Sequence, residues 1–428
     1  MTSKHPLSGL RVVELSRGVA AAYCARQFAA WGADVAMLEP AEGSPIRRLA
    51  PFARGAGGAP RSLAWAYMGA NKRAVAEDSL AEAGGLADLL ARADVFVTDL
   101  AEEALAPFGV SLAGLAQSHP ELCAISITPF GLSGPYAGFA GGELVVQALS
   151  GYLASNGEMG RPPLRLPGHI GAYLAGVSGF VGGLAARYGV MRGAAGDLVE
   201  VSEMETLSAI TPFLRLQYFG GDKVRGGGPE TGVRLLPCRD GHVSLLPLAA
   251  ADHAALSEVL EIPEGAIPEA FAEGPPSAAL IAEAVTFFSA YTRRKTRDEI
   301  FHGLEARGVA CGRLQTPGDL VGDDHLAARG FFRRLEDPDL GTVPFPGPAA
   351  RLAASDIVPP APAPRTRITA GDLGWDVRAE PVSRKAPGAP LQGVRIVDFT
   401  QAWIGPFATM LFGDLGAEVV KIESHKRP

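Results

Sequence analysis

The sequence repeats its own beginning near its end. Residues 6–40 read PLSGLRVVELSRGVAAAYCARQFAAWGADVAMLEP, and residues 390–424 read PLQGVRIVDFTQAWIGPFATMLFGDLGAEVVKIES; the two align without a gap. Each copy predicts an apolar strand that reaches an acid, Glu14 or Asp398, followed by a helix and a second strand. Such self-similarity indicates two homologous units in tandem. We expect residues 390–428 to be the truncated start of the second unit.

The first unit alternates short apolar runs with helical patterns. Strands are predicted at 10–15 and 33–39, with a helix at 20–31 between them and an amphipathic helix at 79–92. Strands that alternate with helices favour a parallel, doubly wound sheet. We therefore predict an α/β protein with a Rossmann-like large domain over residues 1–215.

A smaller domain is predicted after the large one. The run RLLPCRDGHVSLLPL reads as a hairpin whose turn is Asp240-Gly241, and helical segments follow it. We expect a small α+β domain at 216–324 and a return of the chain to the large domain at about 325–355. Residues 356–389 are rich in proline and charge, which is typical of an extended linker.

The overall composition excludes several function classes. The formal net charge of −7 disfavours a general nucleic-acid binder, which would be basic. No G-x-G-x-x-G motif occurs, so a nicotinamide cofactor is unsupported. The N-terminus lacks the apolar run of a signal peptide, and no uninterrupted apolar run reaches the ~20 residues of a membrane span. We expect a cytoplasmic protein that binds neither nucleic acid nor membrane.

The four cysteines are spaced too widely for a metal site. Cys24, Cys123, Cys238 and Cys311 form no C-x-x-C pair. Reduced thiols and no bound metal are therefore expected.

Several motifs, in their order along the chain, resemble the family III CoA-transferases (the CaiB/BaiF family). They are GSPIR, NKRAV, ITPFGLSGPYAG, GDLVEVSEMET and CRDGHVSLL, and the resemblance covers nearly all of residues 6–355. The family includes formyl-CoA and carnitine CoA-transferases and α-methylacyl-CoA racemases. The resemblance implies coenzyme A as a substrate, with acyl-CoA and small carboxylic acids as partners. It also implies dimers whose two chains interlock.

The resemblance places a nucleophilic aspartate where this chain has Ala172. Such an aspartate would attack an acyl-CoA thioester and form a mixed anhydride, which a methyl group cannot do. Glu143, as a substitute acid, and His169, beside the empty position, are the remaining catalytic candidates. Both also have structural interpretations, Glu143 as a helix-start carboxylate and His169 as an ordinary structural histidine. Glu203 is interpreted as structural, where a strand enters a helix.

The resemblance also suggests residues that contact CoA. Arg47 and Lys72 match positions that face its phosphates, although both could be solvated surface charges. Gly226, Gly227 and Gly228 form a glycine run that could cover an active site or link domains.

Three functional hypotheses remain open. The chain could be half of a fused CoA-transferase whose active site lies in the second unit, where the family's lysine is kept as Lys421 but is Met37 in the first copy. It could be a non-catalytic, CoA-ester-binding pseudo-subunit or dimer partner. It could also be an acyl-CoA racemase, which the missing aspartate and a missing family histidine disfavour.

Overall fold

The computed structural model describes residues 5–55, 58–157, 161–210, 234–245, 252–271, 278–376, 388–401 and 403–424. The chain divides into two compact units. Unit 1 comprises Met1–Tyr152, Arg165–Pro212 and Phe331–Pro428, and unit 2 comprises Leu153–Leu164 and Phe213–Gly330. The domain boundaries expected from the sequence stay predictions.

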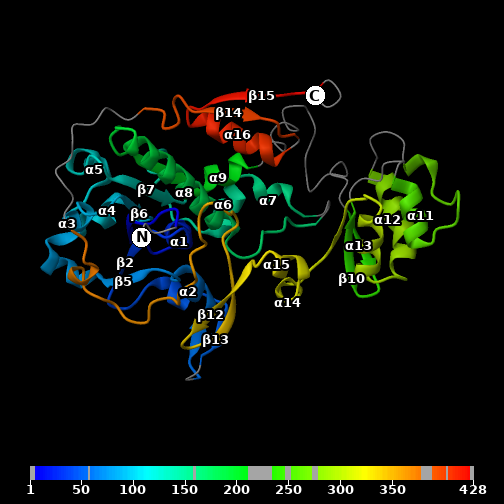
Figure 1. The fold of residues 1–428 in the computed structure, drawn as a ribbon, viewed down its shortest axis with the longest axis horizontal. Coiled ribbons are helices and arrows are strands. Elements are labelled where there is room, and N and C mark those ends of the chain that lie inside the picture. The colour runs from blue at the N-terminus through cyan, green and yellow to red at the C-terminus, as the bar shows by residue number, and fades with distance from the viewer. Residues whose placement is uncertain are drawn as a thin grey trace. The chain divides into compact units, whose positions relative to one another are not determined.

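Unit 1 is built on a six-stranded sheet in the order β5-β2-β1-β6-β7-β8 (Figure 1). The strands are β1 (Arg11–Leu15), β2 (Asp34–Glu39), β5 (Arg73–Ala76), β6 (Val95–Thr98), β7 (Cys123–Thr128) and β8 (Leu198–Ser202). Every neighbouring pair is parallel. The predicted α/β class with a doubly wound sheet is confirmed.

Helices cover both faces of this sheet because alternate strand residues point to opposite sides. Val12 belongs to a core shared with α1 (Val19–Ala30) and α8 (Ile170–Met191). Val13 belongs to the opposite core. That second core includes side chains of α3 (Gly85–Leu90), α4 (Glu102–Leu105) and α5 (Leu112–Ser118).

The prediction of one continuous amphipathic helix at 79–92 is wrong. The segment consists of a 3-10 helix, η2 (Glu77–Ala83), followed by α3. Gly84 lies between them and Gly85 begins α3, at φ +83° and +88°. A left-handed backbone interrupts an α-helix, and glycine takes that conformation without strain.

The segment expected to be a linker is packed on unit 1 as far as residue 376. Ile368 forms a parallel bridge with Val75 of β5. Its backbone N–H donates to Ala74 O, and its carbonyl oxygen accepts the N–H of Ala76, both at 2.9 Å. Trp375 is 6% exposed and donates from Nε1 to Asp34 Oδ2 at 2.7 Å. This stretch thus covers the open edge of the sheet, which would otherwise present unpaired backbone groups.

Further elements of unit 1 lie outside the main sheet. They are η1 (Pro45–Arg48), β3 (Phe52–Arg54), β4 (Pro60–Ser62), α2 (Leu63–Met68), α6 (Glu143–Leu149), α9 (Glu203–Ala209), and the antiparallel pair β12 (Phe332–Asp337) and β13 (Gly341–Pro346).

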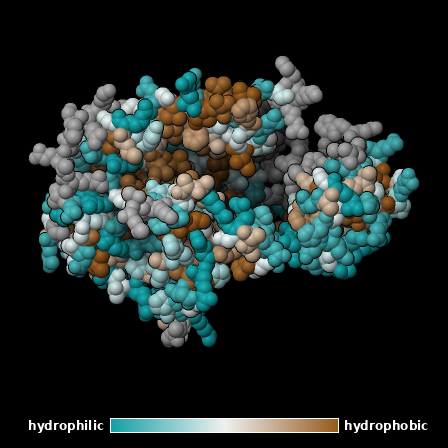
Figure 2. Space-filling view, in the orientation of Figure 1, coloured by the Kyte–Doolittle hydropathy of each residue, from teal (hydrophilic) through white to brown (hydrophobic). Residues whose placement is uncertain are grey.

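The second copy of the repeat folds into the same unit as the first. It forms β14 (Arg395–Asp398), α16 (Ile404–Asp414) and β15 (Glu418–Lys421), with parallel strands in which Asp398 pairs with Lys421. Glu14 pairs with Met37 in the same register in the first copy. The second copy leaves large apolar side chains exposed, and Figure 2 shows hydrophobic residues gathered over this element.

Unit 2 contains the predicted hairpin. β9 (Arg234–Cys238) and β10 (Gly241–Leu245) are antiparallel, and β11 (Cys311–Arg313) adds to β10. Its helices are α11 (His253–Leu260), α12 (Ala278–Thr292), α13 (Arg297–Glu305), α14 (Pro317–Val321) and α15 (Asp324–Ala328). The short helix α7 (Tyr152–Ser155) lies at the junction of the two units in sequence.

Helix α8 packs unusually close to α1 because it carries glycines at the contact. A Cβ atom built on Gly176 would lie 2.7 Å from Ala20 O, and one built on Gly183 would lie 2.3 Å from Ile125 Cδ1. Among the described residues, α8 is also the one helix long and apolar enough to cross a membrane, which the sequence analysis did not expect. Its contacts with α1 and β7 identify it as a core helix.

Two glycines of α8 should respond oppositely to substitution by alanine. Gly176→Ala forces a methyl group onto a backbone oxygen, so it should lower the free energy of unfolding by about 1–3 kcal/mol. Gly189→Ala is the matched control, because its nearest atom would be 3.8 Å away. The control should raise stability by about 0.5–1 kcal/mol through helix propensity. Denaturant unfolding of both variants measures this, and equal effects would contradict the close packing.

Candidate functional site

The candidate site lies at the carboxyl edge of β1 and β6, the switch point of the sheet. The chain leaves β1 toward β2 on one side and leaves β6 toward β7 on the other. Ligands of doubly wound sheets bind where neighbouring strands diverge in this way. Asp99 follows β6 and accepts the backbone N–H of Arg17 at 2.8 Å and of Gly18 at 2.5 Å, so it ties the two diverging loops together.

Glu143, a predicted substitute acid, reaches the start of α8 at Ala172. One carboxylate oxygen accepts the N–H of Gly171 at 2.8 Å, and the other accepts that of Ala172 at 3.2 Å. The side-chain amide of the buried Gln147 donates to the same carboxylate at 2.8 Å. Glu143 therefore caps the N-terminus of α8, where the helix dipole stabilises its negative charge.

Ala172 and His169 also lie at this helix start. Ala172 is 6% exposed and belongs to the core beneath α1. His169 is the N-cap residue of α8, but its side chain makes no capping hydrogen bond, and its ring centroid is 6.5 Å from that of Tyr173. Ala172, His169 and the carboxylate of Glu143 thus all lie at the start of α8, and their predicted roles in catalysis stay predictions. Gly226, Gly227 and Gly228 lie outside the described residues.

Two further acids, Glu203 and Asp99, lie at the same edge of the sheet, and neither was among the predicted catalytic residues. Glu203 begins α9, and burial together with the nearby charges of Glu143 and Asp99 raises its pKa to about 7. Burial raises the pKa of Asp99 to about 6, although the N–H groups of Arg17 and Gly18 oppose this rise. The position of both acids directly after buried strands was the available signal.

Arg47 is engaged inside the protein. Its guanidinium forms a two-point ion pair with Glu39, at 2.5 and 3.0 Å, and lies 3.8 Å from the centroid of the Trp65 ring. Burial works against the charged form of Glu39, but hydrogen bonds from Arg47 and Ser44 outweigh it and lower the pKa of Glu39. These contacts engage Nε and Nη2 of Arg47, and its predicted contact with CoA phosphates stays a prediction.

Lys72 is buried in an ion pair, and its predicted contact with CoA stays a prediction. Its ammonium donates to Glu14 Oε2 at 2.7 Å and to Ala22 O at 2.8 Å, and the side chains of both ionic partners are fully buried. The strand register of the two repeat copies explains why Glu14 needs Lys72. In the second copy, Lys421 lies 3.3 Å from Asp398, whereas Met37 occupies that position in the first copy and cannot neutralise Glu14.

Loss of the Lys72 charge should unfold the protein rather than weaken CoA binding alone. Lys72→Met leaves the Glu14 carboxylate buried without its cation, which should lower the free energy of unfolding by about 3–5 kcal/mol. The double variant Glu14→Gln/Lys72→Met should recover most of that loss. Denaturant unfolding of the single and double variants measures both effects, and a stable K72M protein would contradict the structural role.

The raised pKa of Glu203 predicts a pH-dependent stability. The folded pKa of about 7 exceeds the usual value, so this carboxyl favours the folded state below about pH 4.5, and that contribution is lost as the pH rises through 7. Glu203→Gln should therefore stabilise the protein at pH 8 by about 1–3 kcal/mol and change little at pH 4. Thermal unfolding at both pH values measures this. Glu205→Gln, at an exposed acid of the same helix, is the control.

The sequence model of CoA-transferase family III matches residues 7–367 and, again, residues 391–428. The chain is 29% identical over 431 residues to the probable CoA-transferase Rv1866 of Mycobacterium tuberculosis, covering 94% of this chain and 52% of that protein. It is 30% identical over 358 residues to the succinyl-CoA:(R)-benzylsuccinate CoA-transferase subunit BbsE of Thauera aromatica, covering 79% and 86% of the two chains. It thus spans about half the length of Rv1866.

A solved structure has the same fold. A CAIB/BAIF family protein from Brucella suis superimposes with a TM-score of 0.75 at 25% identity, covering 85% of this chain and 97% of that one. Together with the two matches of the sequence model, this similarity shows that the chain belongs to CoA-transferase family III.

Proposed function

We propose that this protein takes part in CoA transfer between carboxylic acids. We further propose that the first of its two tandem homologous units, which differs from the structural unit 1, acts as a non-catalytic partner of the second. The observation that carries this proposal is Ala172, a buried methyl group at the N-terminus of α8. An acyl-transfer nucleophile needs an oxygen, sulfur or nitrogen at that point.

The pairing of the cations at the switch-point edge supports the proposal that the first homologous unit does not bind the phosphates of CoA. Arg17 pairs with Glu77 at 2.6 Å, Arg47 pairs with Glu39, and Lys72 pairs with Glu14. Each positive charge is thus already neutralised within unit 1. A CoA site would need cations that keep free donors.

The relatives support a tandem arrangement. The family model matches the chain twice, and Rv1866 is about twice as long as the region matched here. The names of BbsE and of a succinyl-CoA–L-malate CoA-transferase alpha subunit mark those relatives as subunits. In this proposal, the unit that begins at residue 390 supplies the nucleophile and the first unit replaces the second chain of a dimer.

The relatives also indicate which acids to test. Named relatives use succinyl-CoA with benzylsuccinate, D-citramalate or L-malate, and one exchanges CoA between succinate and glutarate. We infer that the acids between which CoA is exchanged are dicarboxylic.

Glu143 supports a second candidate function, in which the first unit is itself catalytic. Its carboxylate would attack the thioester carbonyl, the C–S bond would break, and a mixed anhydride and CoA thiolate would form. The thiolate would then attack the glutamyl carbonyl and release the first acid as a carboxylate. Three hydrogen bonds hold this carboxylate at the helix start, which favours capping over attack.

Trapping experiments distinguish the two functions. The 428-residue protein is incubated with succinyl-CoA, quenched with borohydride or hydroxylamine, and digested for peptide mass analysis. We expect no adduct on residues 5–376, and Glu143→Gln should lose about 1 kcal/mol of stability, as for other lost helix caps, without altering any CoA exchange. An adduct on Glu143 would establish the second function, and an adduct on any other side chain of the first unit would refute the proposal.

A further inference from the structure

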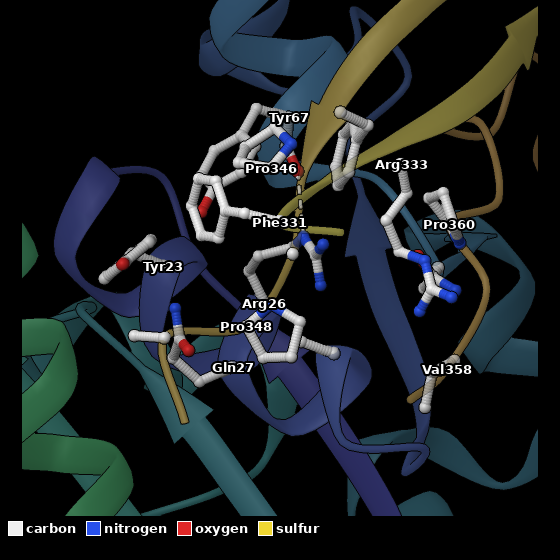
Figure 3. Close-up of a pocket in the computed structure, with 15 residues that line it drawn as sticks. Tyr23, Arg26, Gln27, Tyr67, Phe331, Arg333, Pro346, Pro348, Val358 and Pro360 are labelled. Carbon is white, nitrogen blue, oxygen red and sulfur yellow. Dashed lines mark hydrogen bonds between the residues drawn. The ribbon is translucent and has the colours of Figure 1, made fainter. Parts of the chain in front are cut away.

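A pocket lies in unit 1 that no residue at the start of α8 lines, and its lining is cationic and aromatic. It has a volume of about 200 Å³, enough for a small organic molecule rather than a single water. It is formed by α1, α2, β12, β13 and residues 358–360 (Figure 3). Its main side chains are Tyr23, Arg26, Tyr67, Phe331, Arg333 and Phe345.

Arg26 is the unusual member of this pocket. It is 5% exposed, and its Nε donates to Tyr67 O at 3.1 Å. Its guanidinium lies 5.5 Å from the Tyr67 ring centroid and 5.3 Å from that of Phe345. Among the described residues, Nη1 has no hydrogen-bond partner, and no carboxylate pairs with the side chain. In Figure 3 this guanidinium lies in the middle of the lining side chains.

Such an arginine is unfavourable for the protein unless something binds it. A buried charge normally has an ionic partner, because desolvation of an unpaired charge is costly. Burial accordingly lowers the pKa of Arg26. The two aromatic rings and one carbonyl compensate only in part.

The internal repeat indicates that a strand–helix–strand unit of this kind does not itself require the arginine. The gapless alignment places Met410 of α16 at the position of Arg26 in α1. The same strand–helix–strand unit therefore forms with an apolar side chain at that point. The charge at Arg26 thus needs a reason other than the fold of the repeat.

Arg333 adds a second positive charge to the pocket. It lies on β12, and its Nη1 is also buried without a hydrogen-bond partner among the described residues. None of the fifteen described residues that line the pocket is acidic. An oxyanion is the ligand chemistry that two guanidinium groups without carboxylate partners recognise.

We propose that this pocket binds a small organic anion whose carboxylate or phosphate group is anchored by Arg26 and attracted by Arg333. The apolar part of the ligand contacts the rings of Tyr23, Tyr67 and Phe345. This site does not rest on the function proposed for the start of α8. A ligand can therefore bind this pocket of unit 1 whichever of the two homologous units catalyses CoA transfer.

Anion titration tests the site directly. The 428-residue protein is titrated with succinate, benzoate, inorganic phosphate and adenosine 3′,5′-bisphosphate, at constant ionic strength and with chloride as the reference. Ligands that bind the folded protein raise its melting temperature, so at least one of these anions should give a saturable rise and a calorimetric binding isotherm. Preference for the first pair identifies a carboxylate ligand, and preference for the second pair identifies a phosphate ligand. No saturable response to any of the four would overturn the proposal.

Two variants and a matched control locate the binding. Arg26→Met copies the residue of the second copy, so it should fold with an unchanged or higher melting temperature and weaken the anion at least about tenfold. Arg333→Gln should weaken it less. Arg334→Gln changes an exposed arginine on the same strand, which pairs with Glu336, and should leave binding unchanged. Wild-type affinity in R26M, or a lower melting temperature of R26M without anion, would show that Arg26 is structural and would overturn the proposal.

Discussion

The buried ion pair between Glu14 and Lys72 is the constraint on which the switch-point edge depends. It joins the end of β1, the first turns of α1 through Ala22 O, and the chain that enters β5. A buried carboxylate without a cation would be strongly destabilising, so these three segments are fixed together. The lysine that could have faced a ligand is used for this purpose instead.

The two copies of the repeat satisfy the same acid in different ways. In the second copy the cation comes from the neighbouring strand, as Lys421 beside Asp398. In the first copy that strand carries Met37, and the cation comes from a more distant segment. A hydroxyl two residues after each acid, from Ser16 or Thr400, donates to it in both copies, at 2.7 and 2.6 Å. The two copies thus share the hydroxyl hydrogen bond to the acid, but the positive charge that neutralises the acid comes from different places in the fold.

Part of the structure could be predicted from local pattern, and part could not. The strands at 10–15 and 33–39 and the hairpin at Asp240-Gly241 were predictable, since apolar runs and turn residues act locally. The helix at 79–92 failed because its apolar spacing ran across Gly84 and Gly85. The packing of the segment that ends at Trp375 is not predictable in this way, because its proline-rich composition is typical of a linker and only a few of its side chains are buried.

By itself, the sequence determined the repeat, the α/β sheet and the alanine at position 172, because these depend on residue identity and short-range pattern. Only the tertiary structure decided the roles of the charged residues. Whether the ammonium of Lys72 contacts Glu14, and whether the guanidinium of Arg26 lies in bulk water or in a pocket, depends on segments far apart in the chain. Burial and pairing set the energy of a charge, and neither can be read from the residues beside it.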